Sequence, residues 1–441
     1  SKAFKNQLAV FSSQPAVGSP GSYRDQSSVS SWQSSVSSQQ SSAGSLQPER
    51  INEQEIKSGT GTKTELFHYS SIRDISPVEW NSIFGDKGSF DYNGLRLLEE
   101  TFKNGIKPEN QWGFDYLLIR KNKKIVAATF LTTTIMKDDM LASAEISEQV
   151  EEIRNLSGPY YKTSRVLMTG SMLTEGEHLF IDKSDPDWPG VTAIMLEKIN
   201  ELQELNKAEI VILRDIDFND EQTGEMMLEN GYFKTKMPDK FIATGISPFT
   251  ETDFMKTLSA NSKKNFKKEI LRHENNYSME IIKNADNNFI EKCISLYKNV
   301  KTRNLEINTF TLPDEFFKNV AKDPSWEILV TLSKENMNEE GNEKIMSVIF
   351  SHIGTDTYNP MVIGMDYETQ CQGSPYRQSL YNVMKRASQL GKTKVNLGFS
   401  AGTEKKKVGA KAVEYAAYVY ASDNFIFESL GNYTVTKKHI P

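Results

Sequence analysis

The order of predicted strands and helices repeats once along the chain, and this repeat constrains the fold more than any single motif. In each half, a strand hairpin and a further strand precede a loop, a helix, an apolar strand, a short helix and a strand pair. The first series spans residues 65–245 and the second spans residues 246–441. The repeat predicts an α/β protein with mixed sheets, arranged as two tandem domains that share a topology but little sequence identity.

The first half shows this order through apolar runs that polar turns separate. Residues 116–120 and 124–134 are rich in apolar and β-branched residues, and the short polar segment between them predicts a hairpin. Apolar residues recur at helical spacing from 193 to 205, so we expect a helix there. The apolar run 209–215 predicts a strand that is buried on both faces.

The second half repeats these signals after a strongly basic stretch, residues 254–275, which we predict to be one helix. Because the same kinds of segment then follow in the same order, we expect the same topology. The predicted elements after the basic stretch are strands 327–332, 344–353 and 361–366, helix 376–389 and strands 394–398 and 415–421.

The first 64 residues differ from the rest of the chain. Residues 12–45 are dominated by Ser and Gln, with few side chains that could be buried. Ordering a residue costs about 1–2 kcal/mol of backbone entropy, which such a composition cannot offset. We therefore predict that residues 1–64 form a disordered Ser/Gln-rich leader.

Composition excludes several classes of protein. The 441 residues include 52 Lys+Arg and 58 Asp+Glu, a net charge of −6, which argues against a dedicated DNA-binding protein. Two cysteines and five scattered histidines predict no disulfide framework and no metal site. The chain has no apolar run near the ~18–20 residues that span a bilayer and no signal-type start, so we predict a cytoplasmic protein without a transmembrane segment.

Three motifs in the second half carry a resemblance to a known family. They are Phe254–Lys268, Ser374–Gly391 and Asn396–Ala410, the last with the pattern Leu-Gly-x-Ser followed by Lys-x-x-x-Gly-Ala. With the repeated element order, they resemble the GNAT acyltransferase superfamily. In tandem form the chain is similar to the Fem-type peptidyltransferases and the BioF2-like acyltransferases of the peptidoglycan biosynthesis/recognition group. The resemblance implies an N-acyltransferase that needs no covalent enzyme intermediate.

The resemblance also implies an acyl-donor site at the loop 370–378. A loop that opens a helix exposes free N–H groups and the positive end of the helix dipole, which suits a pyrophosphate. We therefore expect acyl-CoA or acetyl-CoA as the donor, although the superfamily's loop pattern is only partly present and an acyl carrier stays open. The first-half loop 182–189 holds three Asp residues, so we expect its donor site to be degenerate. The predicted donor-binding residues are Gln372, Gly373, Ser374, Tyr376, Arg377 and Gln378.

Acyl transfer to an amine needs a base for the amine and a proton for the leaving group. Asp366 and Glu404 are candidate bases, and Tyr415 or Tyr418 could protonate the leaving thiolate. One residue of the lysine run 405–407 stands where the family carries a lysine near its substrates, and Lys406 is the first choice. The predicted substrate-binding residues are His352, Asn396 and Lys406.

The basic stretch 256–272 could be a solvated face or could bind an acidic acyl carrier protein, tRNA or anionic lipid. Three functions therefore stay open. The first is an N-acyltransferase that moves an acyl group from acyl-CoA or an acyl carrier to a small-molecule amine. The second is tRNA-dependent aminoacyl transfer to a peptidoglycan-type precursor. The third is a non-catalytic tandem GNAT module that binds a pyridoxal-phosphate (PLP)-dependent α-oxoamine synthase.

Overall fold

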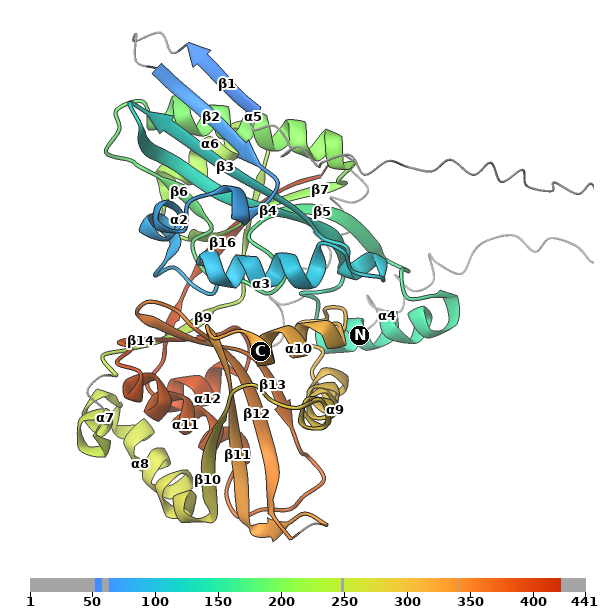
Figure 1. The fold of residues 1–441 in the computed structure, drawn as a ribbon, viewed down its shortest axis with the longest axis vertical. Helices are drawn as coiled ribbons and strands as arrows, with labels where there is room; N and C mark the ends of the chain where they lie inside the picture. Colours follow the sequence, from blue (N-terminus) through green and yellow to red (C-terminus); the bar gives the residue numbers. More distant parts are fainter. Residues whose placement is uncertain (1–51, 58–62, 247–249, 340, 422–441) are drawn as a thin grey trace, which may run out of the picture. The chain divides into compact units, whose positions relative to one another are not determined.

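The computed structural model describes residues 52–57, 63–246, 250–339 and 341–421, which form two sheets with helices packed on them (Figure 1). We call the first sheet with helices α2–α6 the first lobe, and the second sheet with helices α7–α12 the second lobe. The two lobes match the predicted pair of α/β units with mixed sheets.

The first sheet has nine strands in the order β1-β2-β3-β4-β5-β7-β16-β8, with β6 paired to β4 at one side. Most neighbours are antiparallel, and β5 and β7 are a parallel pair. The strands are β1 (Asn52–Lys57), β2 (Lys63–Tyr69), β3 (Gly113–Lys121), β4 (Lys124–Lys137), β5 (Thr163–Thr169), β6 (Leu179–Ile181), β7 (Ile210–Asp217), β8 (Phe233–Lys236) and β16 (Tyr415–Ala421).

The second sheet has seven strands in the order β10-β11-β12-β13-β14-β9-β15. Here β13 and β14 are the parallel pair. The strands are β9 (Lys240–Thr244), β10 (Tyr277–Ile282), β11 (Trp326–Met337), β12 (Glu343–Ile353), β13 (Thr357–Met365), β14 (Lys394–Gly398) and β15 (Lys411–Val413).

The helices cover the sheets in the predicted order, with one addition. Helix α4 falls in a stretch whose sequence is mostly polar, and its buried residues include only one large apolar side chain, Val150, which explains why periodicity did not indicate a helix. The helices are α2 (Pro77–Phe84), α3 (Tyr92–Phe102), α4 (Ala144–Ser157), α5 (Trp188–Asn206), α6 (Glu221–Glu229), α7 (Glu251–Thr257), α8 (Ala260–Glu269), α9 (Asn287–Arg303), α10 (Asp314–Lys322), α11 (Pro375–Gln389) and α12 (Gly402–Lys407), with the 3-10 turns η2 (Ile72–Asp74), η3 (Pro108–Asn110) and η4 (Leu271–Asn276).

The two halves of the chain exchange one strand each. Strand β9 precedes the predicted boundary at 245/246, yet it lies between β14 and β15 of the second sheet. Strand β16 comes near the end of the described chain, yet it lies between β7 and β8 of the first sheet, where Figure 1 shows it in red. The boundary therefore divides the sequence, but the sheets do not follow it.

Strand β1 falls within the segment 1–64 that the sequence predicted as a disordered leader. Strand β1 pairs antiparallel with β2, with Asn52 opposite His68 and Lys57 opposite Lys63. An edge strand can be polar, because its pairing uses backbone groups rather than an apolar face. The Ser/Gln-rich stretch 12–45 lies outside the described residues.

The basic stretch is three segments rather than one helix. Leu258 is extended, and the hydroxyl of Ser259 caps α8 by accepting a hydrogen bond from the backbone N–H of Ser262, at 3.2 Å. A Ser cap interrupts a run of helix-favouring residues because it satisfies the free N–H groups of a new first turn. Helices α7 and α8 and the turn η4 therefore replace the predicted helix 254–275.

The two lobes share one apolar core. It includes Trp80, Phe102 and Trp112 of the first lobe and Phe316 and Phe350 of the second. Across the junction, the rings of Phe102 and Phe316 lie 6.5 Å apart. Burial of each large side chain contributes about 1.5–3 kcal/mol, so separating the lobes would expose a substantial apolar surface.

Candidate active site

Each lobe has an opening where its parallel strand pair stops hydrogen bonding. In the first lobe the β5–β7 ladder runs only from Val166 to Met168 on β5. In the second lobe the β13–β14 ladder covers only Thr357 and Tyr358 of β13. Backbone groups beyond such a point are free to bind something other than a strand, which makes both openings candidate sites.

Charged side chains fill the first opening. The Arg214 backbone N–H donates to the Thr169 hydroxyl at 2.9 Å, and the Arg214 guanidinium donates to the Ser171 carbonyl at 2.8 Å. Its Nε also pairs with the buried carboxylate of Asp215, at 2.9 Å. Arg214 therefore ties β7 to the chain after β5 and closes the opening.

Asp215 and His178 form a second buried pair next to Arg214. Their Oδ2 and Nδ1 atoms lie 3.2 Å apart, and both side chains are shielded from solvent. Burial lowers the pKa of His178 to about 4 despite this carboxylate. Burial raises the pKa of Asp215, but Arg214 and His178 outweigh it and lower this pKa to about 2.

Three residues from different parts of the chain extend this cluster toward the second lobe: Glu175 before β6, Lys240 at the start of β9, and Lys405 in α12. A Cβ built on Gly398 would lie 2.9 Å from Glu175 Oε1, so the Glu175 carboxylate contacts the turn after β14. Burial raises the pKa of Glu175 and lowers that of Lys240. We call Glu175, His178, Arg214, Asp215, Lys240 and Lys405 the inter-lobe charged cluster.

Lys405 is the buried lysine of the run 405–407, with 5% of its surface exposed. Its amine donates to the Phe399 carbonyl, and burial lowers its pKa to about 8 although Glu175 opposes this shift. The turn that precedes α12 and Lys405 is strained, because Ser400 and Ala401 adopt positive φ angles of 61° and 46°, respectively. Strain of this kind persists only where the surroundings impose it, and it is frequent at functional sites.

The structure therefore favours Lys405 over Lys406, the first choice from the sequence. Lys406 is more exposed and lies over the Phe241 ring at 5.7 Å. The sequence held the signal, since Lys405 is the residue four positions before Gly409 in the Lys-x-x-x-Gly-Ala pattern. Glu175 and Lys240 had no comparable signal.

The predicted donor loop folds onto the turn η4. The hydroxyl of Tyr277 donates to the carbonyl of Gln372 at 2.8 Å, and a Cβ on Gly373 would lie 2.9 Å from His273. Gly373 has a φ of +78°, and its close approach is to the protein's own chain. The Gln378 amide is buried and donates to the Ile270 carbonyl at 2.8 Å.

Arg377, at the start of α11, is held by two carboxylates. Its Nε and Nη2 atoms donate to Glu404 at 2.5 and 3.1 Å, and its Nη1 donates to Glu269 at 3.2 Å. Ser374 caps the helix by accepting from the Arg377 backbone N–H, and Tyr376 is largely buried beside it. An incoming phosphate would have to compete with two carboxylates for Arg377.

The candidate base Glu404 is thus a partner of Arg377, whose hydrogen bond lowers the Glu404 pKa. The other candidate, Asp366, organises the loop after β13. It accepts from the backbone N–H groups of Glu368 and Thr369, at 2.7 and 3.1 Å. Burial raises the Asp366 pKa, but these hydrogen bonds outweigh it and lower the pKa. A lowered pKa makes both carboxylates weak bases.

Tyr415 and Tyr418 lie on β16 and hence in the first sheet, with Tyr415 opposite Asp217. Burial raises the pKa of Tyr415, and the amine of Lys240 lies 5.7 Å from its ring. Tyr415 therefore contacts the inter-lobe charged cluster, and Tyr418 packs in the core of the first lobe.

His352 and Asn396 have structural partners. His352 is fully buried, and its Nε2 lies 3.1 Å from Oδ1 of Asp91, the residue that caps α3 of the other lobe. Burial raises the pKa of Asp91, but His352 and the backbone donors outweigh it and lower the pKa. Asn396 on β14 accepts from the backbone N–H of Gly398 at 3.2 Å.

The second opening adjoins a cavity of about 250 Å³ between the lobes. Most of its wall is apolar or aromatic, with β13 contributing residues 361–363. Lys301 of α9 and Glu109 of η3 are the Lys, Arg, Asp or Glu residues of its wall within the described chain. We call this space the lobe-interface cavity; its wall includes Phe102, Trp112, Tyr297, Phe310, Met361 and Ile363.

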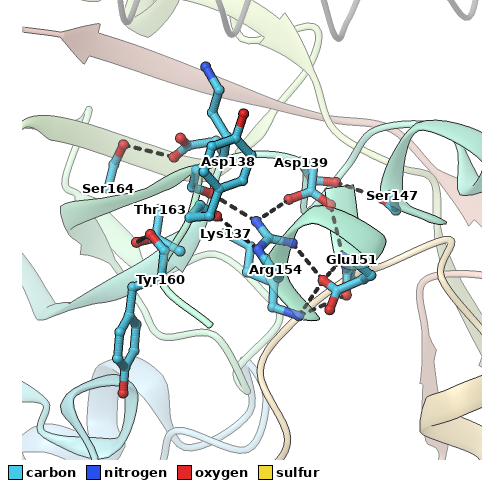
Figure 2. Close-up of polar contacts among 12 residues, drawn as sticks. Lys137, Asp138, Asp139, Ser147, Glu151, Arg154, Tyr160, Thr163 and Ser164 are labelled. Carbon is cyan, nitrogen blue, oxygen red and sulfur yellow. Dashed lines mark hydrogen bonds and ion pairs between the residues drawn. The ribbon is translucent and has the colours of Figure 1, made fainter. Parts of the chain in front are cut away.

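One wall of the cavity is a loop, 304–312, that is pinned to the opposite lobe. The amide of Asn308 donates to Asp139 at 2.8 Å and to Glu151 at 2.7 Å, and its oxygen accepts from Lys137. Figure 2 shows the first-lobe part of this pin, where Arg154 lies between Asp139 and Glu151. Burial raises the pKa of Glu151, but these donors outweigh it and lower the pKa to about 2.

The comparisons with known proteins assign the family. Residues 71–434 match the sequence profile of the FemAB-like family, described as peptidoglycan biosynthesis/recognition. The chain belongs to the FemAB-like family. This FemAB-like protein is therefore a transferase, as the sequence motifs predicted, and its two sheets form the predicted pair of α/β units.

One solved structure supports the fold, and a second is similar at a lower TM-score. A structure titled "Crystal structure of FemX" superposes with a TM-score of 0.54 at 11% identity, over 80% of this chain and 98% of that chain. A tandem GNAT protein from the clavulanic acid biosynthesis pathway has a TM-score of 0.45 at 9% identity, over 82% of this chain and 99% of that chain. The comparison with curated protein sequences gave no match. In the described ranges, no helix combines the length and apolar character needed to cross a bilayer.

Proposed function

We propose that this FemAB-like protein transfers an acyl or aminoacyl group from an activated carrier to an amine, with Lys405 as the base. The observation that carries the proposal is the buried Lys405 amine, whose pKa is lowered to about 8 and which faces Glu175 across the lobes. An amine with such a pKa is partly neutral near physiological pH, so it can accept a proton.

The transfer needs no covalent bond to the protein. The acceptor amine attacks the carbonyl carbon of the donor ester or thioester, so a C–N bond forms and the bond to the carrier oxygen or sulfur breaks. The Lys405 amine takes the proton that the attacking nitrogen loses, and the resulting ammonium returns it to the leaving group. Glu175 stabilises that ammonium because its carboxylate raises the pKa of Lys405.

The two substrates are assigned to the two sides of the second opening. We assign the donor to the α11 side, where the predicted residues Gln372 to Gln378 lie, and the acceptor to the lobe-interface cavity. Segments of both sides approach Lys405: Glu306, whose charge acts on Lys405, precedes the cavity residue Ile307, and Glu404 of the Arg377 pair precedes Lys405. The donor is acyl-CoA, an acyl carrier or aminoacyl-tRNA, and the acceptor amine belongs to a peptidoglycan-type precursor or a smaller molecule.

One observation favours aminoacyl-tRNA as the donor. Helix α8 and turn η4 pack directly on the donor loop, through Gly373 on His273 and Gln378 on Ile270. Lys264, Lys267 and Arg272 on these segments are exposed, and within the described residues none of them makes an ion pair. A polyanionic carrier bound there would neutralise these charges, and the exchange would be sensitive to salt.

The central test is Lys405→Met, which keeps the size of the side chain and removes the base. We expect a loss of transfer activity of roughly 10²–10⁴-fold, the usual contribution of a general base. Lys406→Met is the matched control and should lose less than threefold. Equal activity in both variants, measured with the donor class that binds, would show that Lys405 is not the base.

Donor class is tested separately by thermal shift and filter binding. A donor at 100 times its dissociation constant adds about 2.7 kcal/mol of stability, so acetyl-CoA and charged tRNA can be compared directly. Lys264→Ala/Lys267→Ala should weaken tRNA binding and reduce its salt dependence, whereas Lys292→Ala/Lys298→Ala on α9 should do neither. If acetyl-CoA alone stabilises the protein and tRNA does not bind, the tRNA donor is wrong.

The family assignment favours an enzyme over the non-catalytic binding module. Binding of an acyl carrier protein or of a PLP-dependent α-oxoamine synthase stays a prediction from the sequence, as does a cytoplasmic location.

A further inference from the structure

The lobe-interface cavity is apolar and carries an unpaired positive charge. Its aromatic and aliphatic wall comes from both lobes, with Trp112 and Phe102 on one side and Phe310, Tyr297 and Met361 on the other. A space of this kind excludes a polar ligand over most of its surface and favours an apolar one.

Lys301 supplies the charge. Its amine donates a hydrogen bond to the Thr309 hydroxyl at 3.2 Å, and in the described chain it forms no ion pair. Burial and the nearby Lys137 lower the Lys301 pKa to about 8, although Glu151 and Asp139 oppose the shift. The Lys301 side chain is half-buried, and partial desolvation of a cation without an ion pair is unfavourable, so the site favours an anion that would pair with it.

The neighbouring carboxylates are already used by other cations. Asp139 pairs with Arg154 at 2.5 Å, and Glu151 pairs with both Arg154 and Lys137, at 2.5 and 2.7 Å. Two carboxylates thus face three cations, of which Lys301 is the third. Glu109 lines the first-lobe side of the cavity, where it accepts a hydrogen bond from the Tyr160 hydroxyl at 2.8 Å.

We propose that the lobe-interface cavity binds an aliphatic chain that ends in a carboxylate, with the carboxylate against Lys301 and the chain along the aromatic wall. The cavity volume of about 250 Å³ limits the length of the chain. One water-sized group occupies roughly 30 Å³, so the cavity accepts about eight such groups, a medium-length chain.

This inference deepens the proposed function, because it rests on the assignment of the cavity to a substrate of the transfer. Leu173 lines the cavity and lies two residues from Glu175, and Ile307 lines it beside Glu306. The cavity wall is thus close in sequence to the two carboxylates whose charges act on Lys405. The bound molecule belongs to the class of aliphatic carboxylates, either free or as part of the acceptor.

Isothermal titration calorimetry of the full chain with the series from butanoate to dodecanoate tests the proposal. We expect each added methylene to tighten binding about fourfold until the chain has about eight carbons, after which binding no longer improves. Octanol and octylamine test the charge, and octanoate should bind more tightly than both. If the three eight-carbon ligands bind equally, or octanoate does not bind, the proposal is wrong.

Variants separate the charge from the shape. Lys301→Met should weaken octanoate at least tenfold and leave octanol unchanged, whereas Lys298→Met, at an exposed position on the same helix, should change neither. Ile307→Trp fills the cavity from a loop and should abolish binding of both ligands while the melting temperature is kept. Octanoate binding that survives both Lys301→Met and Ile307→Trp would place the ligand elsewhere.

The proposed function can fail independently of this site. Lys405→Met should lose transfer and still bind octanoate with unchanged affinity. If transfer depends on Lys405 and octanoate never binds, only the assignment of the cavity is wrong. If octanoate binds at Lys301 and Lys405→Met keeps its transfer activity, only the base is wrong.

Discussion

The two openings of the duplicated fold differ in what lies beyond the end of the parallel strand pair. In the first lobe, Arg214 crosses from β7 to the chain after β5 and brings Asp215 and His178 with it. In the second lobe, hydrogen bonding between β13 and β14 ends at Tyr358, and the space beyond adjoins an apolar cavity. The same topology thus holds part of the inter-lobe charged cluster in the first lobe and borders the lobe-interface cavity in the second.

This difference separates residues that stabilise the fold around the proposed site from residues proposed to act in the transfer. The inter-lobe charged cluster brings Glu175 of the first lobe to Lys405 of the second, and the lobe-interface cavity has walls from both lobes. The proposed site therefore draws on both lobes. A duplicated fold can therefore lose one binding site and still need both copies for a single reaction.

The largest effect, on the free energy of unfolding, is expected when the buried pair of Arg214 and Asp215 is broken. Arg214→Met leaves the buried Asp215 carboxylate without its guanidinium, and removing one member of a buried pair costs about 3–5 kcal/mol. Urea unfolding should show this loss in full. Arg73→Met, which breaks an exposed pair with Glu100, should change the free energy of unfolding by less than about 1 kcal/mol. A decrease in the free energy of unfolding below 1 kcal/mol for Arg214→Met would mean that this buried pair does not stabilise the first lobe.

A smaller effect is expected at the cavity wall. Asn308→Ala removes the amide that joins the loop 304–312 to Asp139 and Glu151, and leaving such buried partners unsatisfied costs about 1–3 kcal/mol. Amide hydrogen exchange should speed up in that loop while β13 stays protected. Thr311→Ala, an exposed position in the same loop, is the control, and equal exchange in both variants would show that Asn308 does not hold the loop.

The smallest effect concerns pH and links the two openings. Since Lys405 has a pKa of about 8 and acts as a base when neutral, its neutral fraction rises from roughly a tenth at pH 7 to nine-tenths at pH 9. Activity should rise roughly tenfold over this range. Glu175→Gln removes a charge that raises the Lys405 pKa, so the midpoint should move to lower pH.

Glu177→Gln is the matched control for that pH profile, because Glu177 is exposed and its charge acts on Lys240 and Tyr415. Its midpoint should stay near 8. If the pH midpoint of activity is unchanged in Glu175→Gln, the inter-lobe charged cluster does not affect the pKa of Lys405.

The sequence predicted the two lobes well, because their strands and helices follow hydrophobic periodicity. Strand β14 matched its predicted bounds, 394–398, since five residues of strand between turn signals leave little freedom. Helix α4 was missed because its buried face consists of Ser147, Val150 and the ion-paired Arg154, which make no apolar stripe. Long-range pairing also left no local signal, so β9 and β16 could not be placed in their sheets.

The candidate site was predicted only where a motif named it. Part of the donor loop lies in the motif Ser374–Gly391, and Lys405 lies in the motif Asn396–Ala410. The sequence did not distinguish Lys405 from Lys406 and Lys407; its burial in the structure did. The roles of Arg377 and Glu404 could not be foreseen, because each residue satisfies the other across 27 positions of sequence. Glu175, Lys240 and Lys301 meet their partners only after the lobes assemble.

The strand exchange has a consequence for how the protein can be taken apart and how it can move. A chain cut after β9, at the predicted boundary 245/246, would leave the first sheet without β16, with the edges of β7 and β8 exposed, and the second half would lack β9. Two such fragments should aggregate alone and recover structure only when mixed. The chain therefore crosses between the sheets twice, from β8 to β9 and from β15 to β16, and these two crossings limit how far the lobes can separate.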